Sequence, residues 1–284
     1  MSITRLSGGL TPEDGSDPRT FPAIWNATAD SVEGTQGTVA SQGSAIVALE
    51  ADVDELETRG FRFVETVYFT SNGTFNKADY PWLRAIRVKC QGAGGGSGGC
   101  ASTGDGEAAA SGGGGGGAYA ESFITDIAGL DASVAVTRGA GGAGGAAGDN
   151  AGSNGGNSSF GSLVVGNGGN GGGGSPARIP GGAGGFTGLA GGTQATATGD
   201  LIVSGSGGEG RRFIPIAERI FTGSGGHSFL GGASVSRTST GSSQGDSGGP
   251  FGGGASGSGS AENQAVDLTG NPGGNGIVIV ELFA

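Results

Sequence analysis

The sequence has few of the residues on which metal sites, disulfide frameworks and catalytic triads depend. Only two of its 284 residues are cysteine and only one is histidine. Cys90 and Cys100 form no CxxC pair and have no histidine nearby, which argues against a zinc site. We therefore expect no metal and no other cofactor. For the two cysteines we expect buried free thiols, with a disulfide as the alternative.

Long hydrophobic runs and positive charge are also scarce. No stretch approaches the roughly 20 apolar residues of a membrane span, and the N-terminus has no basic segment followed by an apolar one. The 25 acidic residues outnumber the 14 basic ones, giving a formal net charge of −11. We therefore expect no nucleic-acid partner and no membrane insertion.

Glycine is the residue in excess, with 70 copies that lie nearly all between residues 92 and 276. Ordering glycine costs more backbone entropy than ordering any other residue. Such a tract is therefore either a flexible linker or a structure held by main-chain contacts that only glycine permits.

The spacing of the glycines favours an ordered structure. Gly139, Gly142, Gly145 and Gly148 repeat every third residue, and further glycine rows keep the same period. A period of three is typical of a polyproline II type helix, which has no internal hydrogen bonds and persists only when neighbouring chains bond to it. The nine prolines and the interrupted triplet argue against collagen. The pattern predicts bundled polyglycine II helices.

Short apolar segments interrupt the glycine tract and are typical of strands. They lie at residues 119–124, 134–136, 160–165, 201–203 and 276–283. A linker would not need to end on a buried strand. We interpret residues 61–284 as one folded domain, mainly β with polyglycine II type helices.

The N-terminal residues differ in composition. Residues 1–29 contain little glycine and little periodicity, which predicts an extended arm. Its apolar anchors are Leu6, Leu10, Phe21, Ile24 and Trp25. These residues either bind a partner or pack on this chain's own helix.

Residues 30–60 carry a heptad pattern. The apolar residues of its a and d positions that we expect to mediate oligomerisation are Val39, Ile46, Leu49, Val53 and Leu56. Two clean heptads are too few for an independent coiled coil, so we expect a short coiled-coil neck between folded parts. A helix packed on its own domain is the alternative.

One hexapeptide matches a catalytic motif. Residues 245–250 read GDSGGP, the string around the nucleophile of trypsin-like serine proteases. That chemistry also needs a histidine base and a buried aspartate. His227 is the only histidine and lies only 20 residues before Ser247. In a segment rich in glycine and serine the string arises by chance, and we do not expect an enzyme.

Four ordered segments resemble a known family. The first segment, Phe63 to Cys90, leads through two expected strands into polyglycine. The second is a six-glycine run before Tyr119, the third is Phe160-Gly161, and the fourth is Ile277 to Glu281. Together they resemble the glycine-rich domain of bacteriophage tail fibre and tail adhesin proteins over residues 63–283. Two departures are Tyr80-Pro-Trp82 and an apparent insertion at 209–222.

The resemblance implies a fibrous homotrimer in the virion, assembled in the host cytoplasm. The N-terminal arm would dock on other virion proteins, and the glycine-rich domain would attach to a bacterial surface glycan or outer-membrane protein. A head or collar decoration fibre is an alternative, because the sequence does not distinguish the two locations. A glycine-rich ice-binding protein is an alternative of a different class.

The expected receptor contacts lie in the segment with the most side chains. The candidate residues are Arg211, Arg212, Phe213, Arg219 and Phe221. Arginine beside aromatic residues suits anionic or carbohydrate surfaces. The alternative is a small local core made by Phe213, Ile216 and Phe221. Further candidate loops are 101–111, 150–158, 175–180 and 237–246.

Overall fold

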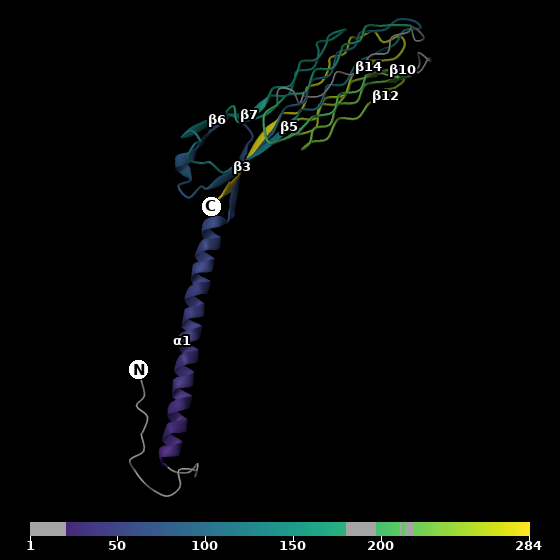
Figure 1. The fold of residues 1–284 in the computed structure, drawn as a ribbon. Coiled ribbons are helices and arrows are strands. Elements are labelled where there is room, and N and C mark those ends of the chain that lie inside the picture. Colours follow the sequence, from purple (N-terminus) through teal and green to yellow (C-terminus); the bar gives the residue numbers. More distant parts are fainter. Residues whose placement is uncertain (1–20, 180–196, 211, 214–218) are drawn as a thin grey trace. The chain divides into compact units, whose positions relative to one another are not determined.

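The structure is a computed structural model that describes residues 21–179, 197–210, 212–213 and 219–284. The chain divides into two units, Met1–Phe61 and Arg62–Ala284. Among the described residues, the first contains one long helix and the second contains the strands (Figure 1). Leu6 and Leu10 lie outside the described residues.

The helix of the first unit begins earlier than expected. Helix α1 spans Phe21–Arg59, so Phe21, Ile24 and Trp25 belong to the helix and not to an extended arm. Pro22 does not oppose this earlier start, because proline is tolerated in the first turn, where backbone N–H groups have no partner in the helix. The expected start at residue 30 was therefore wrong.

The apolar heptad residues of α1 face solvent in the single chain. Exposed fractions at these positions run from 45% to 64%, for Val39, Ile46, Leu49 and Val53. The side chain of Leu56 lies outside the described residues. Apolar side chains repeated along one exposed stripe are typical of a helix that packs against other helices.

The second unit begins with two antiparallel sheets. The larger has the order β1 (Phe63–Phe69), β15 (Ile277–Phe283), β3 (Ala85–Gln91), β5 (Tyr119–Ile124) and β9 (Leu201–Val203). The smaller has the order β2 (Gly73–Asn76), β6 (Ser133–Thr137), β7 (Ser158–Phe160) and β8 (Val164–Gly166). A short 3-10 helix, Lys77–Asp79, follows β2. The strands predicted at 119–124, 134–136, 201–203 and 276–283 are confirmed, whereas the predicted strand 160–165 was wrong, because a turn at 161–163 separates β7 from β8.

The main hydrophobic core lies between these two sheets. Alternate residues of β3 and β15 point into it, so Ile86, Val88, Val278 and Val280 are fully buried. The smaller sheet contributes aromatic and branched side chains to the same cluster, including Phe75, Val134, Val136, Phe160 and Val164. This sandwich is the part of the unit that an ordinary core stabilises.

The glycine-rich segments run from this sandwich as extended chains that bond to one another. The N–H groups of Gly94, Gly95 and Gly96 donate to Gly274, Gly115 and Ser153, three different segments, at 2.8–3.0 Å. The next three residues repeat this pattern with acceptors displaced by three residues: the N–H groups of residues 97, 98 and 99 donate to Asn271, Gly112 and Asn150. A β-strand bonds to neighbours on two sides only, so this pattern differs from a sheet.

The packing of these segments leaves no room for side chains at their contacts. A Cβ atom on Gly95 would lie 2.0 Å from the carbonyl oxygen of Asn170, and a Cβ on Gly114 would lie 2.1 Å from that of Gly95. Where a segment lies at the surface, asparagine supplies the missing acceptor. The Oδ1 atoms of Asn154 and Asn157 accept the N–H groups of Gly171 and Gly168 at 2.9 and 3.0 Å.

Both cysteines are free and buried, which confirms the first of the two expectations. Burial raises the pKa of the Cys90 thiol to about 12. Its thiol donates to the carbonyl oxygen of Val164 at 3.4 Å. Cys90 therefore stays protonated and unreactive at neutral pH.

Gly95→Ala should be strongly destabilising, because its methyl group would meet the backbone of residue 170. We expect a loss of about 3 kcal/mol in the free energy of unfolding, or failure to fold. Gly173→Ala is the matched control: it lies in the same tract, and a Cβ atom there would have nothing within 4 Å. The control should stay within about 1 kcal/mol of the parent protein. Equal denaturation midpoints for the two variants would contradict this account.

Candidate binding surfaces

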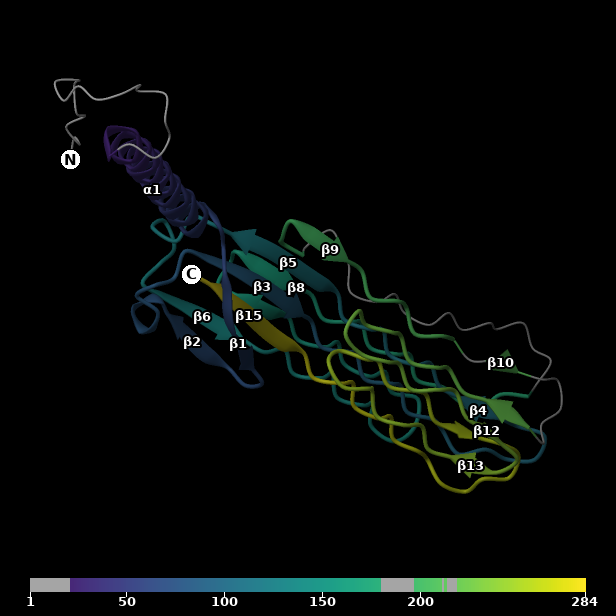
Figure 2. The same ribbon diagram turned by 90° about the horizontal axis from the view of Figure 1, so that it is seen from below.

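The glycine-rich unit has two distinct ends. At one end, Arg62 and Ala284 exchange backbone hydrogen bonds of 3.0 and 2.9 Å, so both chain ends of the unit meet beside the larger sheet. At the other, which we call the distal end, lie β4 (Ala109–Ala110) and the short strands β10–β14 (Figures 1 and 2). The glycine-rich segments separate the two ends.

The distal end is built from two small antiparallel sheets. In one, the middle strand β11 (Ile220–Phe221) pairs with β10 (Arg212–Phe213) and with β12 (Thr238–Ser239). In the other, the middle strand β14 (Gly259–Ser260) pairs with β13 (Ser242–Ser243) and with β4. The candidate loops 101–111 and 237–246 therefore meet at this end.

The predicted receptor residues that the structure describes, 212, 213, 219 and 221, lie at the distal end, but not as one described cluster. Arg219 is exposed and Phe221 is half-buried. Arg212 and Phe213 are described only as the backbone of β10, and Arg211 lies outside the described residues. Ile220, which was not among the predicted residues, is fully buried and packs with Ala108 and Ala261.

Acidic side chains of the distal loops are used to hold backbone N–H groups. Glu107 accepts from Gly104 at 2.8 Å, and Glu262 accepts from the N–H of residue 106 at 2.7 Å. Asp267 accepts from the Ser102 N–H at 2.6 Å, which lowers the pKa of its carboxyl group. These carboxylates fix loop shape.

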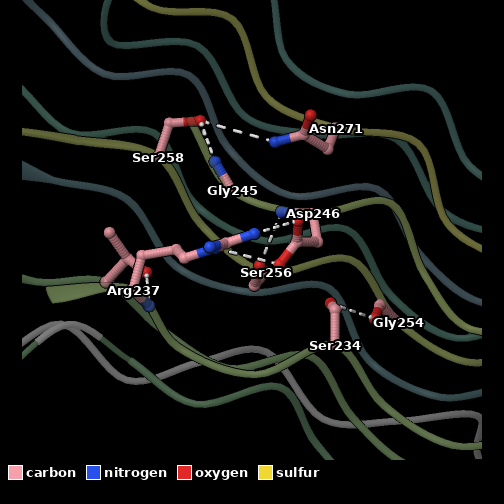
Figure 3. A network of polar contacts seen from close by, with 9 residues as sticks. Ser234, Arg237, Gly245, Asp246, Gly254, Ser256, Ser258 and Asn271 are labelled. Atoms are coloured by element: carbon pink, nitrogen blue, oxygen red, sulfur yellow. Dashed lines mark hydrogen bonds and ion pairs between the residues drawn. The ribbon is translucent and has the colours of Figure 1, made fainter. Parts of the chain in front are cut away.

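A polar network connects β12 with the segments that follow it (Figure 3). The guanidinium group of Arg237 donates two hydrogen bonds to the carboxylate of Asp246, at 3.0 and 2.5 Å. This pairing raises the pKa of Arg237. The Asp246 N–H donates to Ser256 Oγ at 2.8 Å, and the Gly245 N–H donates to Ser258 Oγ at 3.2 Å.

The GDSGGP segment does not assemble a catalytic triad. Asp246 is paired with Arg237, as Figure 3 shows, and not with a histidine. Nδ1 of His227 accepts the N–H of Ala233 at 3.3 Å. Ser247 is exposed, in a segment without strand or helix. The aspartate of this motif therefore holds its own segment against Arg237 and Ser256.

Two turns near the larger sheet expose an apolar patch that the sequence reasoning missed. Phe229, Leu230 and Phe251 are exposed, and the ring of Phe229 packs on buried Tyr119 with centroids 4.5 Å apart. The turns are joined because Ser228 Oγ donates to the carbonyl of residue 251 at 2.7 Å. We call Phe229, Leu230 and Phe251 the turn patch.

Phe251 adopts a backbone conformation that is costly for its residue type. Its φ is 56°, in the left-handed region that a bulky side chain rarely occupies. Backbone strain of this kind is concentrated at functional sites. The only sequence signal was the Pro250-Phe251-Gly252 turn, which does not reveal φ.

Neither a metal site nor a membrane span emerges from the described parts of the chain. No group of three or more histidine, cysteine or acidic side chains is placed there to hold a metal ion. Helices of sufficient length and hydrophobicity for a transmembrane span are also absent from those parts.

Comparison with known proteins identifies a family for the second unit. Residues 70–283 match the family described as Glycine-rich domain, so the match covers most of that unit. No curated protein matches the sequence.

Substitution of Phe251 by asparagine should relieve strain, because asparagine tolerates positive φ. We expect the free energy of unfolding to stay level or rise by about 1 kcal/mol. Phe229→Asn is the control within the same patch: it removes the ring contact with Tyr119 and should cost about 1 kcal/mol. Thermal or urea unfolding measures both. A larger loss from Phe251→Asn than from Phe229→Asn would show that Phe251 is retained for packing.

Proposed function

The chain belongs to the glycine-rich domain family, and because four of its segments resemble phage tail fibre and tail adhesin proteins we propose that it is a bacteriophage virion protein, a short tail fibre or fibre tip that attaches to the host cell surface. The observation that carries the proposal is the separation of the two ends of the glycine-rich unit. The chain enters beside the larger sheet, and the distal end presents loops away from that point. An attachment tip needs this arrangement.

We infer that the extended glycine segments are polyglycine II helices. Three observations support the inference: the three-residue glycine period, the three-residue repeat of hydrogen-bond partners from residue 94 to residue 99, and the absence of backbone bonds within residues 92–99. The carbonyl groups of this segment show the same three-residue repeat, because the N–H groups of Gly142 and Gly145 donate to the oxygens of residues 94 and 97. Bundled helices of this kind would be rigid without a large apolar core.

We infer a homotrimer joined by α1. The exposed stripe of Val39, Ile46, Leu49 and Val53 supports self-association, because it leaves several large apolar side chains in water in the single chain. Three copies rather than two follow from the resemblance to phage fibres. Residues before the helix would dock on other virion proteins, together with Phe21, Ile24 and Trp25.

We infer that the host contacts lie at the distal end. Arg211, Arg212, Arg219 and Phe221 would meet a surface glycan or outer-membrane protein, since arginine binds anionic groups in pairs of hydrogen bonds and stacks on flat rings. The turn patch is a second candidate contact, because an exposed aromatic patch that retains backbone strain is typical of a binding surface.

Competition for adsorption tests the attachment function. Purified full-length protein, added to bacteria before the parent phage, should block adsorption in a dose-dependent way. The Arg211→Ala, Arg212→Ala, Arg219→Ala triple variant should block at least ten times less while keeping the same oligomeric state. Phe251→Asn reports on the turn patch in the same assay.

Two results would contradict the attachment function. A folded oligomer that blocks nothing at any dose would favour a head or collar decoration fibre. Inhibition of ice recrystallisation would favour an ice-binding protein. Full blocking by the triple variant would remove the arginine segment from the binding site while leaving the attachment function in place.

Oligomerisation through α1 is tested with Ile46→Asp and Leu49→Asp. A negative charge at one a position, Ile46, and one d position, Leu49, should dissociate the oligomer and raise its dissociation constant at least a hundredfold. Val47→Asp is the matched control, since Val47 is 65% exposed on the same helix but lies at a b position. Sedimentation velocity distinguishes the species. Dissociation by Val47→Asp to the same extent would refute the heptad assignment.

A further inference from the structure

Part of one face of the larger sheet is exposed to solvent, while Gln91, Tyr119 and Ile277 on the same face are buried. Cross-strand pairing places Phe63 opposite Phe283, and Tyr68 opposite Ile279, on the side away from the core. The same face of β3 and β5 carries Arg87 opposite Phe123, and Lys89 opposite Glu121. We call this surface the open sheet face; its residues are Phe63, Thr66, Tyr68, Arg87, Lys89, Glu121, Phe123, Ile279, Glu281 and Phe283.

Aromatic residues dominate one side of the open sheet face. Phe283 contacts Phe63 and Phe123 edge to face, with centroids 5.9 and 5.5 Å apart. Phe63, Tyr68 and Phe123 are exposed, Tyr68 by 63%. Contiguous apolar surface of this kind marks an interaction site on a soluble protein.

The charges on the face are already compensated within the chain. Arg87 lies 3.4 Å from a carboxylate oxygen of Glu121 and 3.5 Å from one of Glu281. Lys89 also pairs with Glu281. The Arg87 guanidinium lies over the Phe123 ring at 5.5 Å from its centroid. A partner could cover these two cations and two anions without supplying charges of its own.

The chain connection limits where this face can lie in an oligomer. Helix α1 ends at Arg59 and β1 begins at Phe63, so three residues join them. Three extended residues span about 10 Å. In any bundle joined through the apolar stripe of α1, the first residues of β1 from each copy are therefore held close to the bundle. Phe63 itself belongs to the open sheet face.

We propose that the open sheet face packs against the glycine-rich unit of a neighbouring copy of this chain. The inference rests on the proposed oligomer and specifies where its copies meet beyond the helix. It also separates two surfaces by role: the open sheet face contacts another copy, while the distal end stays available to the host.

Cysteine labelling in the full-length protein tests this assignment. Tyr68→Cys places a thiol on the open sheet face, and Val235→Cys is the control, since Val235 is 69% exposed elsewhere on the unit. The two native cysteines are buried and give a low background, which the parent protein measures. A thiol-specific reagent at neutral pH, in excess, gives the rate for each variant.

In the intact oligomer we expect the thiol of Tyr68→Cys to react at least ten times more slowly than that of Val235→Cys. Adding Ile46→Asp and Leu49→Asp should bring the two rates together, because the neighbouring copy is then lost. Equal rates in a protein that sediments as an oligomer would overturn the proposed contact alone. A parent protein that sediments as a monomer at micromolar concentration would overturn both the oligomer and this contact.

Discussion

Hydrogen bonds between backbones of neighbouring glycine-rich segments are the interaction on which the second unit depends. They can form because glycine has no Cβ, so neighbouring backbones approach closely. At Gly95, a Cβ atom would lie only 2.0 Å from the carbonyl oxygen of Asn170. Each segment then bonds in several directions, and the entropy lost by ordering glycine is offset by main-chain contacts in place of an apolar core. Asn154 and Asn157 extend the same bonding to surface segments through their side chains.

Two parts of the unit are therefore stabilised by different interactions. The sandwich between β3, β15 and the smaller sheet buries Ile86, Val88 and Val280 and provides the ordinary hydrophobic stabilisation. The glycine segments then carry loops to the distal end without needing further apolar side chains. Larger side chains are accordingly concentrated in turns and short strands, where the backbone contacts leave room for a Cβ.

Several features could be predicted because they depend on local pattern. The glycine period, the apolar run at the C-terminus and the burial of both thiols follow from spacing and composition. The start of α1 could not be predicted in this way, because Pro22 is equally compatible with an arm and with the first turn of a helix. The turn patch was missed because its strain and its contact with Tyr119 depend on φ and on packing between distant segments.

Residue type and period were enough to favour an ordered, mainly β tract that is acidic and poor in catalytic side chains. Which side chains meet depends on how distant segments fold onto one another. Asp246 pairs with Arg237 instead of serving a serine nucleophile, and Lys89 pairs with Glu281, which lies 192 residues away. Bonding between extended segments uses backbone groups that every residue carries, so local sequence patterns do not reveal which segments become neighbours.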